Sequence, residues 1–166
     1  MSRRSWNMRR AAASNHAGIS VCQLACPGAD TGANGTNILS QYNHIRNIMQ
    51  GITSDGGTLY YNIGGENGSG SGDKILSNLV HDTSDASIID FGTGVALKGY
   101  GGNGIYLDAQ SGGVDVEDNV VYDISAFTVH VTEGPTVLQL PDPNTFKNNI
   151  FSLGKTGMFI LNQPWQ

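Results

Sequence analysis

The chain has 166 residues, enough for one domain but too few for two well-buried cores. Its 23 glycines and its charged content of 14%, against about 25% in an average protein, argue against helical bundles and coiled coils. The formal net charge is −5, and four of the nine basic residues lie in the first ten positions, which leaves five basic and 14 acidic side chains in residues 11–166. Such a body offers no basic stripe for phosphates, and no apolar run approaches the roughly 18 residues of a membrane span. We therefore expect neither nucleic acid nor a membrane as a partner.

Residues 1–36 are expected to form a poorly ordered leader ahead of a single domain at 37–166. The leader has the positive flank of an export signal but lacks the apolar core of about 7–15 residues that such a signal needs. Cys22 and Cys26 are the only cysteines of the chain, and one C-x-x-x-C pair alone is weak evidence for zinc. The leader thus predicts no metal site and leaves the redox compartment open.

An asparagine followed by aliphatic residues recurs along the domain, in HIRNIMQ, ILSNLVHD, VEDNVVYD and FKNNIFSL. Asparagine favours turns, and stacked side-chain amides can form a ladder of hydrogen bonds. We therefore expect these residues to mark the corners of a repeat, with glycine supplying the positive φ that sharp corners need. The four asparagines, spaced 31, 41 and 30 residues apart, are Asn47, Asn78, Asn119 and Asn149.

Short strands with alternating apolar residues are predicted between the corners, at GTLYYNI (57–63), GIYLDA (104–109), AFTVHV (126–131) and GMFILN (157–162). Aligned on their first inward residue, they place Leu59, Ile105, Phe127 and Met158 in one column. The shortest spacings define a unit of about 22 residues, with insertions chiefly at 83–102 and 134–144. This pattern is typical of a parallel β-solenoid, so we predict an all-β fold of about four to five coils.

The segments SDGGTLYYNIG, ILSNLVHD, YGGNGIYLDAQSGGVDVEDNVVYDISAFTVHV and FKNNIF resemble the right-handed parallel β-helix proteins of the pectate-lyase-like superfamily. The likeness covers roughly residues 37–160 and is greatest to bacterial secreted β-helix proteins associated with glycoside hydrolases, including those like family 141. The resemblance implies a right-handed parallel β-helix, a polysaccharide substrate and a secreted or periplasmic location. It also matches Asp55 to an acid of the family's motif.

Alternation along the strands sends every second side chain outward and groups the candidate site residues. Asp108 is expected to lie between Asn62 and His130, because neighbouring coils are about 4.8 Å apart. The adjacent outward column would hold Tyr60, Tyr106 and Thr128. A carboxylate can act as nucleophile or general acid on a glycoside, an imidazole can orient it, and tyrosine rings can face a sugar. We therefore predict Asp108 and His130 as catalytic and Tyr60, Asn62 and Tyr106 as substrate-binding, with a merely solvated sheet face as the alternative.

A glycosidase needs a second carboxylate about 5–10 Å from the first. Asp55 is a candidate catalytic residue, but straight strands would place it about 23 Å from Asp108. It therefore qualifies only if Gly56-Gly57 turns the chain back. Glu66 and Glu133 are rival acids on the same side of the strands, and Glu133 is also predicted to bind substrate.

The insertion at 83–102 is about 20 residues long, a length that favours a functional loop. We interpret it as a wall or lid of a groove, with a disordered ornament as the alternative. Asp82, Asp85 and Asp90 form the only plausible calcium cluster. His81, in NLVHD, is expected to be a corner residue satisfied by the backbone.

These features favour a cofactor-free enzyme that hydrolyses a neutral or branched polysaccharide through a carboxylate pair. A lyase or epimerase acting on uronic-acid polymers is the first alternative, and it would need basic residues or bound Ca²⁺. The negatively charged body would repel such a polyanion. A noncatalytic solenoid for glycan binding or surface display is the second alternative. Because uncovered solenoid ends expose strand edges, we expect a piece of a longer β-helix or end-to-end self-association.

Overall fold

The computed structural model describes residues 37–49, 56–62, 72–84, 88–89, 96–97, 102–108, 111–132 and 143–162, together with strands at 5–6, 11–12 and 17–22. These residues form strands and connecting turns without a helix, which confirms the predicted all-β class for this part of the chain. In the same ranges, no helix is long and apolar enough to cross a membrane.

Three sheets, each of five parallel strands in sequence order, make up the body. The first sheet contains β1 (Ser5–Trp6), β4 (Leu39–Gln41), β7 (Lys74–Leu76), β12 (Asp115–Glu117) and β15 (Thr145–Lys147). The second contains β2 (Ala11–Ala12), β5 (His44–Ile48), β8 (Leu79–Thr83), β13 (Val120–Val121) and β16 (Ile150–Phe151). The third contains β3 (Ala17–Cys22), β6 (Gly57–Asn62), β11 (Asn103–Asp108), β14 (Phe127–Thr132) and β17 (Gly157–Asn162).

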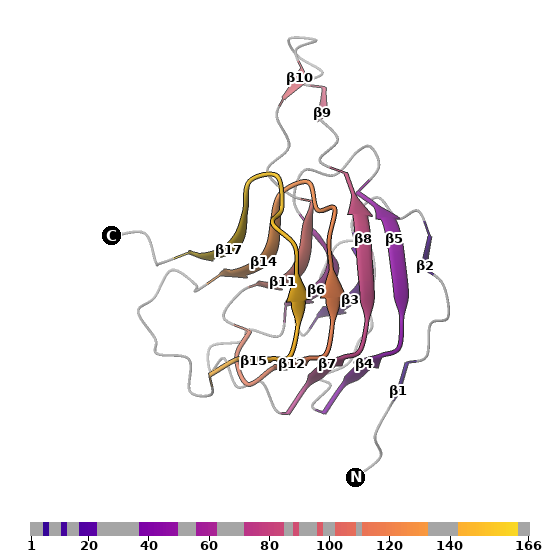
Figure 1. Cartoon of the computed structure of the whole chain (residues 1–166), viewed down its shortest axis with the longest axis vertical. Helices are drawn as coiled ribbons and strands as arrows, with labels where there is room; N and C mark the ends of the chain where they lie inside the picture. Colours follow the sequence, from indigo (N-terminus) through magenta and orange to yellow (C-terminus); the bar gives the residue numbers. More distant parts are fainter. Residues whose placement is uncertain are drawn as a thin grey trace.

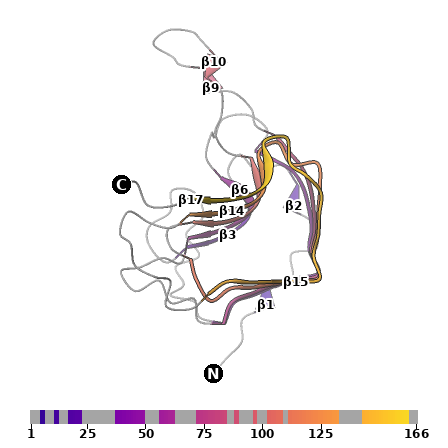
Figure 2. The same ribbon diagram turned by 60° about the vertical axis from the view of Figure 1, so that its left-hand side comes forward.

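The chain visits the first, second and third sheets in turn and then returns to the first, an order consistent with a solenoid (Figure 1). Figure 2 shows the three sheets as sides around a shared interior. The four strands predicted from alternation are confirmed to within one residue at each end. Parallel neighbours in each sheet are separated by a whole circuit of the chain, so most stabilising contacts are distant in sequence.

The expected leader contributes three of these strands. Within residues 1–36, β1, β2 and β3 pair in parallel with β4, β5 and β6, respectively. The other residues of the leader lie outside the described part of the chain. Each of the three is the edge strand of its sheet, where it pairs with the backbone of the strand one circuit of the chain later.

The insertion at 83–102 carries a two-stranded antiparallel hairpin, β9 (Ile88–Ile89) and β10 (Ala96–Leu97). Figures 1 and 2 both show these two strands projecting beyond the body. Most other residues of the insertion lie outside the described ranges, so its function as a wall or lid stays a prediction.

One corner, between the first and second sheets, is built by an asparagine ladder. The backbone N and Nδ2 of Asn43 donate to Oδ1 of Asn78, at 3.0 and 2.9 Å. Asn78 donates in the same way to Asn119, and Asn119 to Asn149, all at 2.9 Å. The prediction of a ladder is therefore confirmed for three of its residues. Its first member is Asn43 and not Asn47, which lies inside β5.

Each ladder asparagine follows a residue with positive φ, and none of these is glycine. The residues are Tyr42, Ser77, Asp118 and Asn148, with φ between 50° and 57°. The expectation that glycine shapes the corners is therefore wrong here, although it holds at Gly72 and Gly113 of the preceding corner. The second bond of each amide explains why asparagine is needed: Nδ2 of Asn78 and of Asn119 also donates backward, to Ser40 O and Ile75 O. One asparagine side chain thus links three successive circuits of the chain.

The preceding corner, at the start of the first sheet, buries an aspartate. Asp73 is fully buried, and its Oδ1 accepts a 2.8 Å hydrogen bond from the backbone N of Ile38. Asn144 has the equivalent position two circuits of the chain later, and its Oδ1 accepts a 3.0 Å hydrogen bond from the backbone N of Val114. Oδ2 of Asp73 has no hydrogen-bond partner among the described residues. Burial consequently raises the pKa of Asp73 to about 6, against the lowering by its backbone hydrogen bonds.

Stacked aliphatic columns fill the interior. Leu59, Ile105 and Val129 are direct neighbours in the third sheet and are fully buried. The columns of all three sheets end in phenylalanine at the last level, and Phe159 makes T-shaped contacts with Phe146 and Phe151 at 5.5 and 5.7 Å. Phe159 remains 43% exposed, so this aromatic cluster closes the core only partly at that end.

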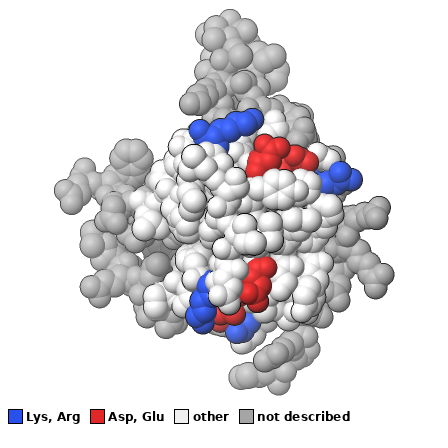
Figure 3. All heavy atoms as spheres, in the orientation of Figure 1, with Lys and Arg blue, Asp and Glu red and all other residues white. Residues whose placement is uncertain are grey.

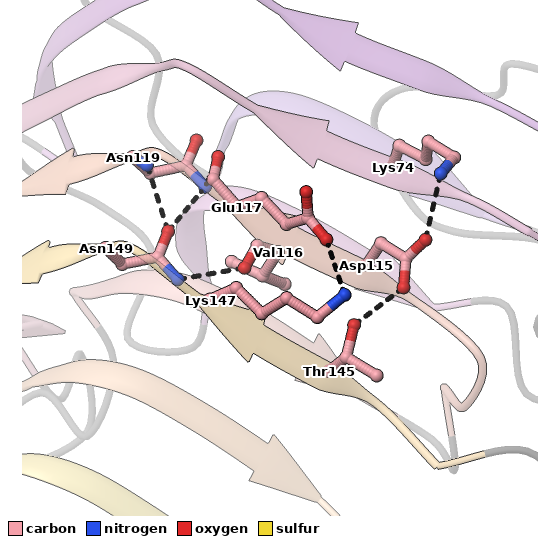
Figure 4. A network of polar contacts seen from close by, with 8 residues as sticks. All are labelled: Lys74, Asp115, Val116, Glu117, Asn119, Thr145, Lys147 and Asn149. Atoms are coloured by element: carbon pink, nitrogen blue, oxygen red, sulfur yellow. Dashed lines mark hydrogen bonds and ion pairs between the residues drawn. The ribbon is translucent and has the colours of Figure 1, made fainter.

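Charged side chains outside the core are organised along the first sheet. Lys74 bonds Asp115 at 3.0 Å and Lys147 bonds Glu117 at 3.0 Å, each across one pair of strands (Figure 4). A hydrogen bond from Thr145, followed by that from Lys74, lowers the pKa of Asp115. On the face seen in Figure 3, charged side chains form small groups in a largely neutral surface. These exposed pairs contribute at most about 1 kcal/mol each.

Candidate functional site

The third sheet brings most of the predicted site residues together on the face opposite the core. Tyr60, Tyr106 and His130 are direct neighbours on β6, β11 and β14. Two residues further along, Asp108 is level with Asn62. The site therefore lies where three adjacent strands approach their C-terminal ends.

The predicted register is correct for the first two strands and wrong for the next two. Ile105 is level with Leu59, as expected, but its neighbour on β14 is Val129 rather than Phe127. His130 therefore lies beside Tyr106 and not beside Asp108. Both registers keep the same inward and outward alternation, because a slip of two residues leaves side chains on their own face.

The last strand is displaced by one residue from its predicted position. Phe159, not Met158, is the neighbour of Val129. A shift by one residue exchanges the two faces of a strand. The exposed positions of both side chains, at 39% for Met158 and 43% for Phe159, explain why hydrophobicity could not separate the two registers.

A short hydrogen bond links two of the predicted site residues across the sheet. The hydroxyl of Tyr60 donates to Oδ2 of Asp108 at 2.6 Å. Asp108 is half-buried at the end of β11, and Tyr60 reaches it diagonally from β6. A phenol that donates to a carboxylate oxygen orients the carboxylate.

Aromatic rings continue this contact across the sheet. Tyr60 and Tyr106 meet edge to face at a centroid distance of 5.2 Å, and Tyr106 stacks on His130 at 4.2 Å with an interplanar angle of 3°. Thr132 completes the group, because its Oγ1 lies 3.2 Å from Nε2 of His130 and donates to the Tyr106 hydroxyl at 3.4 Å. Thr132 was not predicted from the sequence, although it occupies the column of Asp108 once β14 is in its correct register.

Burial decides what this group can do chemically. Tyr60, Tyr106 and His130 are only 6, 2 and 2% exposed. They are not the open, solvated sheet face considered as the alternative, and their rings do not form an exposed platform for a sugar. Desolvation lowers the pKa of His130 to about 4, although Asp108 raises it. The imidazole is therefore neutral at neutral pH and does not supply a stored proton.

Asp108 is the only acidic residue in the five strands of this sheet. Asp55, Glu66 and Glu133, the expected partners for a carboxylate pair, lie outside the described residues. The side chain of Asn62 is likewise not described, although its backbone is level with that of Asp108. The described part of the site thus contains one positioned carboxylate.

The remaining candidates belong to a different face. His81 and Asp82 lie on β8 in the second sheet, and His81 bonds the side chains of His44 and Asp82. The expectation that backbone groups satisfy His81 at a corner is therefore wrong. Asp85 and Asp90, proposed with Asp82 as a calcium cluster, lie outside the described residues. Within the described ranges, no three or more His, Cys, Asp or Glu side chains are arranged to hold a metal ion.

Comparisons with protein-family models, curated proteins and solved structures found no match to this chain.

Proposed function

We propose that this chain is a right-handed parallel β-helix of the pectate-lyase-like type, with about five coils, that hydrolyses a neutral polysaccharide. Five strands in each of three parallel sheets support the coil number. A secreted or periplasmic location belongs to the same proposal. The substrate would meet the protein at the C-terminal ends of β6, β11 and β14.

The observation that carries this proposal is the 2.6 Å hydrogen bond from Tyr60 to Asp108. A carboxylate held in one orientation and half-exposed at a strand end can attack an anomeric carbon or activate water. Asp108 is the reacting carboxylate in this mechanism, and Tyr60 positions it by donating a hydrogen bond to its Oδ2. His130, which is neutral, contributes by packing against Tyr106 rather than by transferring a proton.

The second carboxylate must come from outside the five strands of the sheet. Asp55 and Glu133 are proposed to supply this second carboxylate, because they flank β6 and β14 in sequence. Asn62 and Glu133 are proposed to contact sugar hydroxyls, whereas Tyr60 and Tyr106, whose rings are covered, are proposed to support the site from beneath. No cofactor is needed for this reaction class.

A noncatalytic glycan-binding or surface solenoid is the second candidate. It is favoured by the finding that Asp108 is the only acid in the strands of the third sheet. A carboxylate without a catalytic partner can still accept hydrogen bonds from sugar hydroxyls. This candidate predicts glycan affinity without turnover.

A uronan lyase or epimerase is the third candidate, and the described basic residues do not favour it. Lys74 and Lys147 bond to Asp115 and Glu117 on the first sheet, away from Asp108. Substrate carboxylates would therefore have to be held by residues outside these pairs or by Ca²⁺. Ca²⁺-dependent activity on acidic glycans would identify this candidate.

The test is an activity screen of the full chain against neutral and acidic glycans, with and without EDTA, together with Asp108→Asn. We expect release of reducing ends from a neutral glycan, insensitive to EDTA and reduced at least about a hundredfold by Asp108→Asn. Asp118→Asn is the matched control: Asp118 is exposed on the corner, and Asn148 holds the same left-handed conformation at the next level. Far-ultraviolet circular dichroism verifies that both variants fold.

Cleavage that survives Asp108→Asn would overturn the mechanism. If the protein binds a glycan but cleaves none, the noncatalytic solenoid is selected. Ultraviolet-absorbing unsaturated products would select the lyase. End-to-end self-association is a further proposal, supported by the exposed Ile150, Leu153 and Leu161 at the last level. Light scattering after size exclusion would show a monomer if it is wrong.

A further inference from the structure

A pair of histidines lies on the outer face of the second sheet, separate from the Asp108 site. His44 on β5 is level with Leu79 of β8, and His81 on β8 is level with Arg46 of β5. The two histidines are therefore diagonal neighbours, at a spacing that long side chains on adjacent strands can bridge. Their apolar neighbours on the same strands, Ile45 beside His44 and Val80 beside His81, face the core.

The imidazole rings converge through one nitrogen each. Nε2 of His44 lies 2.7 Å from Nε2 of His81, and Nδ1 of His81 lies 2.8 Å from Oδ2 of Asp82. A carboxylate accepts the proton of Nδ1, which leaves the lone pair of His81 Nε2 directed at His44. His44 then donates from Nε2, so a single proton occupies the space between the rings.

Neighbouring side chains hold His81 in this orientation. The ring of Tyr122 stacks on it at 4.8 Å with an interplanar angle of 8°. His81 is 8% exposed, whereas His44 is exposed. Asp82 has a left-handed backbone, with φ of 55°. One nitrogen ligand is thus buried and held by its neighbours, and the other lies at the surface.

We propose that His44 and His81 form a binding site for a borderline divalent transition ion, which replaces the proton shared between their Nε2 atoms. Metal–nitrogen bonds of about 2.0–2.1 Å at a tetrahedral angle require the two nitrogens to be about 3.3 Å apart. His44 would therefore have to move by about 0.6 Å from its present 2.7 Å separation. Asp82 supplies the carboxylate that bonds the outer nitrogen of a metal-bound histidine.

The class of ion follows from the ligands. Imidazole nitrogen suits Cu²⁺, Ni²⁺ and Zn²⁺, whereas Ca²⁺ and Mg²⁺ require oxygen ligands. Since the described residues offer no third protein ligand in metal geometry, water completes the coordination and the positions stay open to exchange. The divalent series predicts that Cu²⁺ binds more tightly than Ni²⁺ or Zn²⁺.

The experiment is calorimetric titration of the full chain with Ni²⁺, Zn²⁺ and Cu²⁺, combined with electron paramagnetic resonance of the Cu²⁺ complex. We expect one ion per chain and splitting from two imidazole nitrogens. His44→Asn and His81→Asn should each weaken binding at least about tenfold and leave one coordinated nitrogen. Asp82→Asn should weaken it about 10–100-fold while both nitrogens stay coordinated. Asparagine tolerates the left-handed conformation of Asp82, so this variant keeps the backbone.

His130→Gln is the matched control, because it removes an imidazole from the third sheet, whereas His44 and His81 lie on the second. A Cys22→Ser/Cys26→Ser variant tests the thiols in the same way. Both should leave stoichiometry, affinity and nitrogen splitting unchanged. Loss of binding in either control, unchanged affinity and two-nitrogen splitting in His44→Asn or His81→Asn, or no binding at micromolar to millimolar concentration would overturn the proposal.

Discussion

The hydroxyl of Tyr60 donates a 2.6 Å hydrogen bond to Oδ2 of Asp108, although the two residues are 48 apart in sequence. Tyr60 is level with Tyr106 in the sheet, so its side chain crosses diagonally to reach an acid two positions further on. The contact fixes a carboxylate at a strand end and fills the adjacent outer face with an aromatic ring. Stability and orientation of the proposed site therefore depend on the same bond.

Tyr60→Phe removes this hydrogen bond and keeps the ring. We expect the free energy of unfolding to fall by about 1–2 kcal/mol, because the acceptor is a half-buried carboxylate that loses its donor. Urea unfolding measures the change. Tyr122→Phe is the control: Tyr122 stacks on His81, and its hydroxyl makes no hydrogen bond in the described structure. Equal effects of the two substitutions would contradict the assigned bond.

The asparagine ladder should be much more sensitive in its middle than at its end. Asn119→Ala leaves the backbone N and Nδ2 of Asn78 without their acceptor in a fully buried position, and we expect a loss of about 3 kcal/mol or more. Asn149→Ala, at a half-buried position of the last level, should cost about 1 kcal/mol, because water can replace the lost bonds. Chemical denaturation of both variants compares them. A larger loss for Asn149→Ala would contradict a ladder anchored in the interior.

Asp73 should make the protein less stable as pH rises from about 4 to 6. Its folded pKa of about 6 exceeds the ordinary aspartate value of 3.8, so the folded state binds the proton more tightly in this interval. Asp73→Asn keeps the Oδ1 acceptor for Ile38 and copies Asn144 at the equivalent corner. We expect the variant to be more stable than the original by about 1 kcal/mol or more at pH 7 and to lose this advantage at pH 4. A stability difference independent of pH would contradict the assignment.

His130 should act in the opposite direction over nearly the same interval. Its folded pKa of about 4 lies below the ordinary histidine value of 6.5, so the unfolded state takes up the proton first and stability falls as pH decreases from about 6.5 to 4. His130→Gln should flatten this dependence. Thermal unfolding of the original protein and the variant at pH 4, 5, 6 and 7 measures it. An unchanged pH profile in His130→Gln would contradict burial of a neutral imidazole.

Tyr42 should be replaceable by glycine with a gain in stability. It is 73% exposed and has φ of 55°, a conformation that costs a bulky residue about 1 kcal/mol. Tyr42→Gly should therefore raise the free energy of unfolding by several tenths of a kcal/mol or more. Lys155→Gly, at an exposed position that is not among those with positive φ, should lower it. Destabilisation by Tyr42→Gly would show that the ring contributes more than its backbone costs.

Part of the candidate site could be predicted because the relevant strands are short and strongly alternating. The pairing of Tyr60 with Tyr106 and of Asn62 with Asp108 follows from aligning two glycine-led segments, and the structure has both. The position of His130 could not be obtained in this way. A two-residue slip preserves alternation, so only the packing of Tyr106 against the imidazole separates the two registers.

The first corner shows the same division. Asn47 is followed directly by Ile48, whereas Asn43 is followed by His44. The pattern of an asparagine before an aliphatic residue therefore favours Asn47 as the first ladder residue. The tertiary structure decides between them: the amide of Asn43 donates to Oδ1 of Asn78, whereas Asn47 lies further along the strand. The His44–His81 contact is similar, because its residues are 37 apart and meet only when β5 lies beside β8.

Composition and local alternation were therefore sufficient for the all-β class, four of the five strands of the third sheet and most of the ladder, since glycine, asparagine and period-two patterns act within a few residues. The tertiary structure alone decided the register of the later strands, the burial of the tyrosine–histidine face and the meeting of His44 with His81. These depend on contacts made one circuit of the chain apart, where identical local patterns permit several alignments and packing selects one.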